Sequence, residues 1–237
     1  MSTSPSAVML DPAHVLRLLT VIILVFGFLH LISMPVYVEG MKAADGFYVR
    51  LARKVMLQTE RAVPTWFAAF LLALNMVLLW FSGTAIRQLG RGSGLHWFFL
   101  SAIFAFLSLD ESLVIHEAIG VAVSRLLDAK GLLTFPWIVP GAVFTTIVAL
   151  AYVGFLRRLP RRTALLFVAS GAIFVGGALG MEAIESYTVS RVGFGRLYYL
   201  QVLVEECLEM FGQALFAYAI LDHLARLDVP FRISSGR

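Results

Sequence analysis

Long apolar segments are the feature that most limits what this chain can fold into. Such runs recur from about residue 15 to about residue 221. A helix needs roughly 20 mainly apolar residues to cross a bilayer, where the backbone must satisfy its own hydrogen bonds. With 59% hydrophobic and only 14% charged residues, the 237-residue chain has too little polar surface for a soluble globule. The bilayer is therefore its expected solvent.

The pattern predicts an all-α fold, an integral membrane bundle of six transmembrane helices plus one interfacial amphipathic helix. The expected spans lie at about residues 15–38, 63–86, 95–125, 136–156, 164–187 and 197–221. Between the first two, the stretch 39–60 sets Phe47 and Leu51 against Arg50, as a helix lying on the membrane surface would. No soluble domain or repeat interrupts the pattern, so residues 1–237 are expected to form a single transmembrane domain.

The distribution of positive charge suggests an orientation. Four arginines fall in the short loop LRRLPRRT between the fourth and fifth expected spans. Loops rich in Lys and Arg stay in the cytoplasm, and six crossings put both termini on that same side. The count over all loops is nearly even on the two sides, so this loop carries the prediction.

Eight acidic residues lie inside three of the expected spans, and no Lys or Arg accompanies them there, since Arg125 marks the end of the third. They are Asp110, Glu111, Glu117, Glu182, Glu185, Glu205, Glu206 and Glu209. A charge near the bilayer centre costs roughly 2.5 to 3.5 kcal/mol even on lenient scales, so these groups need protons, water or cations. Because successive spans run in opposite directions, all eight fall in the outer half of the bilayer. His30 and His116 share that half, and Glu60 precedes the second span.

Helical spacing predicts which side chains meet. At about 100° per residue, one arc of the last span carries Glu205, Glu206, Glu209 and Gln213. On the third span, Asp110 and Glu117 are seven residues apart and nearly eclipsed, while Glu111 and His116 diverge to opposite sides of that stripe. We expect at least three carboxylates among Asp110, Glu182, Glu205 and Glu209 to lie close enough to share a cation.

The fifth span carries its acids one turn apart, at Glu182 and Glu185. They follow Gly176 and Gly180, whose small surfaces favour close packing against a neighbouring helix. The sequence therefore predicts a tight helix contact beside the acids.

Clusters of carboxylates with one or two histidines on facing helices build paired iron or manganese sites in bundles. The sequence thus predicts a divalent metal, with iron or manganese favoured and zinc possible, although the usual Glu-x-x-His pairing is absent. The candidate ligands are the eight acids, His30 and His116, with Glu60 and Gln213 nearby. A zinc hydrolase site typically has more histidine ligands than His30 and His116 supply. A haem with His30 and His116 as axial ligands is the third choice of cofactor.

Two functions fit these acids. The leading one is a metalloprotein acting on a lipid-soluble molecule, as an oxidoreductase with iron or a hydrolase with zinc. The alternative is a proton- or divalent-cation-coupled transporter, which explains less well why the inner halves of the spans are apolar. A third interpretation pairs Glu60, Glu117 and Glu185 with arginines in the headgroup region. The expected partners are lipid and a lipid-soluble substrate; the spread of basic residues does not indicate nucleic acid, and oligomeric state stays open.

Two motifs carry a resemblance, VPTWF after Glu60 and LSLDESLVIHE around Asp110 to Glu117. They resemble those of an uncharacterised group of bacterial multi-pass membrane proteins. The resemblance implies a six-helix fold in the bacterial inner membrane, with Glu60, Asp110, Glu111, His116 and Glu117 in its motifs, but it implies no activity or cofactor. The alkaline ceramidase type of membrane hydrolase needs a His-x-x-x-His pair that this chain lacks.

Overall fold

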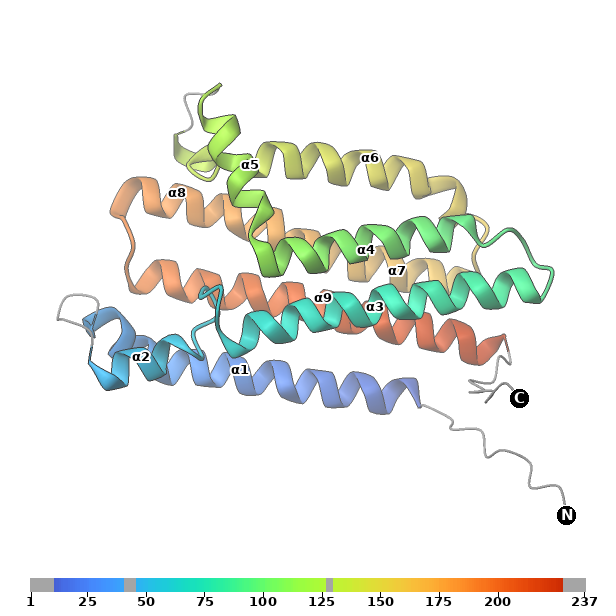
Figure 1. Cartoon of the computed structure of the whole chain (residues 1–237), viewed down its shortest axis with the longest axis horizontal. Helices are drawn as coiled ribbons and strands as arrows, with labels where there is room; N and C mark the ends of the chain where they lie inside the picture. The colour runs from blue at the N-terminus through green and yellow to red at the C-terminus, as the bar shows by residue number, and fades with distance from the viewer. Residues whose placement is uncertain (1–10, 41–45, 127–129, 228–237) are drawn as a thin grey trace, which may run out of the picture.

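The computed structural model describes residues 11–40, 46–126 and 130–227, and in these ranges the chain is helical without strands. Long helices run roughly side by side along one axis (Figure 1). The helices are α1 (Pro12–Gly40), α2 (Phe47–Arg53), α3 (Val63–Gln88), α4 (Leu95–Leu113), α5 (Ile115–Ser124), α6 (Ile138–Leu156), α7 (Arg161–Val175), α8 (Glu182–Val192) and α9 (Arg196–Arg226). A 3₁₀ turn, η1 (Gly131–Leu133), precedes α6, and a π-helix, η2 (Gly176–Met181), joins α7 to α8.

Four helical segments among the described residues are long and apolar enough to cross a membrane: α1, α3, α6 and the continuous stretch from α7 to α8. A fifth is added if α4 and α5, which meet at a bend of 78°, count as one span. Large apolar side chains lie exposed along the outside of these helices, for example Phe28 on α1 and Ile147 on α6. The all-α prediction is confirmed, and the apolar helices and surfaces are consistent with a membrane protein.

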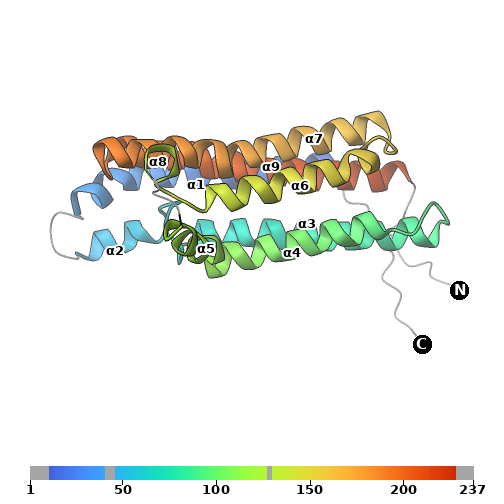
Figure 2. The same ribbon diagram turned by 90° about the horizontal axis from the view of Figure 1, so that it is seen from above.

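Helix α9 lies at the centre of the bundle. It packs against α1, α3, α7, η2 and α8, and the view from above shows it enclosed by its neighbours (Figure 2). We call the end where α1 begins and α9 ends the terminal end, and the opposite end, with α2, α5 and α8, the acidic end (Figure 1). All the acids of interest lie toward the second.

The half of the bundle toward the terminal end is filled by aromatic rings. The indole of Trp97 contacts Phe155, Phe167 and His223, with ring centroids 5.3 to 5.8 Å apart. Nearer the middle, Phe104 and Phe216 stack with centroids 5.0 Å apart and planes within 5°. We call these rings the aromatic plug. The rings pack closely and make this half mainly apolar, although buried polar side chains lie there too, such as His223 and Thr163, 3.3 Å apart.

Two local predictions differ from the structure. The stretch 39–60 contains the short helix α2 followed by turns, and residues 41–45 lie outside the described residues. The third expected span is broken at Val114, which adopts a left-handed conformation with φ of 57°. A β-branched residue is strained there, and no Gly or Pro marks the position, so the pattern of apolar residues did not reveal the break.

Candidate functional site: a carboxyl cluster at the acidic end

The centre of the site is Glu205 on α9, whose side chain is buried. Its carboxyl group is in hydrogen-bonding contact with both Glu182 and Glu185 of α8, and Glu185 is only 1% exposed. Two carboxyl groups in such contact must share a proton or a cation, because two ionised oxygens repel one another. This trio therefore needs positive charge from outside its own side chains.

A second trio completes the cluster. Glu111 of α4 interacts electrostatically with Glu206 and Glu209 of α9. These two glutamates also interact with the acids of α8. We call the six residues the carboxyl cluster: Glu111, Glu182, Glu185, Glu205, Glu206 and Glu209. The structure thus brings together acids from the third, fifth and last expected spans.

Close packing of η2 against α9 brings the acids of α8 near those of α9. A Cβ atom at Gly177 would lie 2.9 Å from the carbonyl oxygen of Glu205 and 2.9 Å from Cγ of Glu209. The prediction for Gly176 and Gly180 is wrong, since a Cβ at either would meet nothing within 4 Å. The extra residue of a π-helix shifts the following register, and this shift was not visible in the spacing of the glycines.

Asp110 and His116 form a pair beside the cluster. The carboxylate of Asp110 accepts a hydrogen bond from the backbone N–H of His116 at 2.7 Å, and its other oxygen lies 3.0 Å from His116 Nδ1. It thereby caps α5, because it pairs a backbone N–H in the first turn that has no partner within the helix. The predicted spacing is wrong here, because the break brings His116 onto Asp110 and carries Glu117 to an exposed position.

Trp137 links this pair to the cluster. Its ring lies against the imidazole of His116, with centroids 4.8 Å apart, and its indole N–H donates to Glu182 Oε1 at 3.1 Å. Trp137 was not among the residues singled out in the sequence. It comes just before α6, far along the chain from every predicted ligand, so no spacing rule could find it.

His30 lies apart from these contacts and has no free ring nitrogen. Its Nδ1 accepts from the backbone N–H of Leu57 at 3.2 Å, so Nε2 carries the proton and donates to the carbonyl oxygen of Tyr199 at 2.9 Å. The ring is fully buried and ties α1 to α9. Glu60, in the turn before α3, is exposed. In the described part of the chain, neither side chain forms a hydrogen bond or ion pair with the carboxyl cluster.

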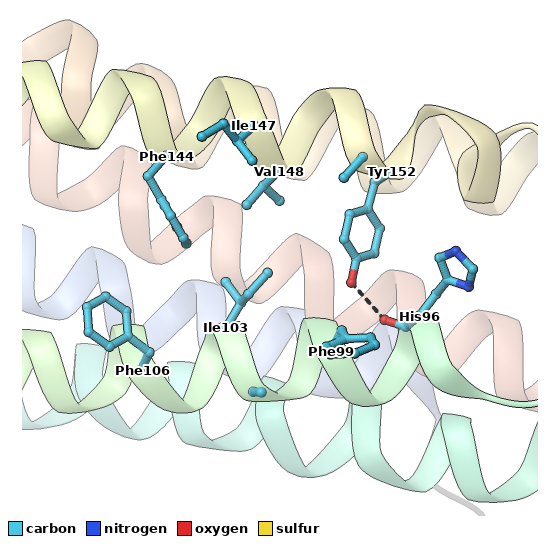
Figure 3. Close-up of a pocket in the computed structure, with 10 residues that line it drawn as sticks. His96, Phe99, Ile103, Phe106, Phe144, Ile147, Val148 and Tyr152 are labelled. Atoms are coloured by element: carbon cyan, nitrogen blue, oxygen red, sulfur yellow. Dashed lines mark hydrogen bonds between the residues drawn. The ribbon is translucent and has the colours of Figure 1, made fainter.

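A groove lies between α4 and α6 and extends from His96 and Tyr152 to Phe106 and Phe144 (Figure 3). It has a volume of about 510 Å³, and its lining is almost entirely apolar. Tyr152 closes one end by donating to the carbonyl oxygen of His96 at 2.9 Å. At the other end stand Phe106 and Phe144, with ring centroids 6.5 Å apart, and Phe106 is one helical turn before Asp110. The groove opens sideways, where lipid would lie.

The side chains are not arranged around a single ion. Within residues 11–40, 46–126 and 130–227, no three His, Cys, Asp or Glu side chains are grouped as ligands of one metal. The expectation that three carboxylates already stand close enough to share a cation is therefore not met with the side chains as placed. Metal binding here requires glutamates to change rotamer, which three rotatable bonds permit.

Comparison of the chain with curated proteins finds no match, and comparison with solved structures finds none either. A family model does match it, over residues 16–224, which include the whole carboxyl cluster and nearly all of the helical bundle. That family is described as a domain of unknown function, DUF8692. Because the match covers most of its length, the chain belongs to the DUF8692 family.

Proposed function

We propose that this is a six-span membrane protein whose carboxyl cluster binds divalent metal and acts on a lipid-soluble substrate. The observation that carries the proposal is the contact of Glu205 with two further carboxyl groups. Along α9 no Lys or Arg lies between Arg196 and Arg226, so no basic side chain of that helix neutralises the acids. A bound cation would remove the cost of burying them.

The six-span topology follows if α4 with α5 forms the third span and α9 the sixth. Helix α9 has 31 residues, which at 1.5 Å each is long enough to cross, and its acids are sheltered by other helices. At its terminal end, Asp222 pairs with Arg162 and Arg226 at 3.2 and 2.9 Å, as expected at a membrane surface. The arginines before α7 lie at that end, which favours a cytoplasmic side for it and for both termini, in a bacterial inner membrane.

The donor set decides which metal we favour. Carboxylates of Glu182, Glu185 and Glu205 are hard oxygen ligands, with Glu209 and the Asp110–His116 pair within reach of a second ion. Such sets suit iron or manganese, whereas zinc prefers more nitrogen or sulfur. When bound, such metals activate water or oxygen for hydrolysis or oxidation. The lateral groove offers an apolar chain a route to the acids without passage through water.

The metal content of the intact protein tests the proposal. We expect about one or two ions of iron or manganese per chain after purification in mild detergent without chelators, measured by elemental analysis. A buried carboxyl cluster that works without metal would show only trace metal, even after incubation with iron, manganese or zinc salts. That result would exclude the metalloprotein and leave shared protons as the charge that neutralises the cluster.

The contact of Glu205 with two further carboxyl groups also supports the alternative, a proton- or cation-coupled transporter, because such groups can share protons. Transport needs access from both faces, and the aromatic plug stands between the cluster and the terminal end. We therefore expect vesicles containing the protein to show no uptake of protons or Mn²⁺ above protein-free vesicles, measured with enclosed pH-sensitive and Mn²⁺-quenched dyes. Saturable uptake that Glu205→Gln abolishes would replace the enzyme proposal with the transporter.

A further inference from the structure

Two buried amide side chains lie next to the carboxyl cluster and are incompletely paired. Asn75 of α3 is fully buried and Gln213 of α9 is 2% exposed. Asn75 Nδ2 donates to the carbonyl oxygens of Leu71 and Gln213, both at 3.0 Å. Asn75 Oδ1, Gln213 Oε1 and Gln213 Nε2 have no hydrogen-bond partner among the described residues. We call the two residues the amide layer.

The amide layer lies between the carboxyl cluster and the aromatic plug. Gln213 is one turn after Glu209 and two turns after Glu206, so the three side chains share one face of α9. Side chains on a helix lean toward its N-terminus, which aims the Gln213 amide at Glu209. On the other side, Phe216 stacks on Phe104 and closes the space. The layer is therefore the inner wall of the acidic site.

The unpaired atoms specify the chemistry of what they bind. Native proteins rarely leave buried amide groups unsatisfied, because each loses its water without replacement. Here two acceptors and one donor lack partners. A metal ion could pair with the oxygens alone, and a hydrocarbon with none of them. A hydroxyl group both donates and accepts, so it can serve Gln213 Oε1 and Nε2 together.

We propose that the amide layer binds a hydroxylic oxygen beneath Glu209, supplied by water or by the hydroxyl head of a lipid-soluble molecule. This site goes beyond the proposed metal function, because it uses different side chains. It holds equally whether protons or metal ions neutralise the carboxyl cluster. It also places this oxygen close to Glu209, at the inner limit of the site.

Thermal unfolding of Gln213→Met tests the site, since Met has a similar shape and no amide. We expect the melting temperature to fall by about 2 to 8 °C, because the bound oxygen loses its partners. Met210→Leu is the control: Met210 is also fully buried on α9, and this apolar exchange measures repacking alone. Both variants are compared after chelator treatment, so that the outcome does not depend on metal.

A second pair of variants shows whether a lower melting temperature of Gln213→Met comes only from poor packing of the Met side chain. Gln213→Asn and Gln213→Leu introduce side chains of similar size, one polar and one apolar. With a bound hydroxyl, Gln213→Asn is the more stable of the two. An unchanged or raised melting temperature for Gln213→Met, or greater stability of Gln213→Leu than of Gln213→Asn, overturns the proposal, because removing unpaired amides then stabilises the protein.

Analysis of the native protein and of Gln213→Met also identifies the molecule that supplies the oxygen. Mass spectrometry of organic extracts would show a hydroxyl compound in the native protein and its loss from Gln213→Met if a lipid-soluble molecule is bound. If no compound is found and the destabilisation persists after exchange into lipid-free detergent, the oxygen belongs to water. Either result supports the site.

Discussion

Replacement of Glu205 by Gln is expected to lower bound metal at least roughly tenfold, a loss of about 1.4 kcal/mol or more in binding free energy. Glu205 is in hydrogen-bonding contact with both acids of α8, so a neutral amide removes the central anionic ligand. The fold should survive, because an amide costs less to bury than an unpaired carboxylate. Elemental analysis and thermal unfolding of the purified variant measure the two effects.

Glu117→Gln is the matched control for this variant. It makes the same chemical change on α5, at an exposed residue that the break at Val114 carries away from the other acids. We expect its metal content to equal that of the unchanged protein. Equal metal in Glu205→Gln would show that α9 supplies no ligand, and an equal loss in both variants would point to nonspecific charge attraction.

Gly177→Ala is expected to damage both the fold and the site. The added Cβ would lie 2.9 Å from the backbone oxygen of Glu205 and 3.2 Å from the backbone nitrogen of Glu209. Backbone atoms of a packed helix cannot rotate aside, so η2 and α9 must separate. Overpacking of this kind costs about 1 to 3 kcal/mol, or roughly 2 to 12 °C in melting temperature for a chain of this size. Metal content should fall with it, because the acids of α8 move away from Glu205.

Gly176→Ala provides the comparison, since the neighbouring position is open and a Cβ there would meet nothing within 4 Å. Ala is the better helix former, so we expect an unchanged or slightly raised melting temperature and full metal content. If the two variants behaved alike, the close approach of η2 to α9 would not be what holds the cluster together.

Much of the fold was predictable because spanning segments are local features. The run at 15–38 became α1 (Pro12–Gly40), and the start at Val63 with Pro64 in the first turn was found as expected. Strict alternation of direction was enough to bring Glu111, Glu182 and Glu205 to one end. None of these steps needs knowledge of which side chain touches which.

The contacts inside the site were less predictable. The spacing argument assumed one straight helix from 95 to 125, and the left-handed Val114 invalidated it by bringing His116 onto Asp110. The close approach at Gly177 depends on the π-helical register of η2. Trp137 and Asn75 reach the site from helices that carry no acid there, so nothing in their surroundings marked them.

The amino-acid sequence by itself determined that the chain is helical, that it carries segments long and apolar enough to cross a bilayer, and that the acids of the cluster gather at one end. These properties follow from the length, polarity and order of the segments, because the free energy of transferring a segment from water to lipid is the sum of the contributions of its residues. Only the tertiary structure decided which acids meet, that His30 is used in hydrogen bonds, and that the amide side chains of Asn75 and Gln213 are incompletely paired near Glu209. Such contacts depend on breaks, register and rotation, where a shift of one residue turns a helix face by about 100°.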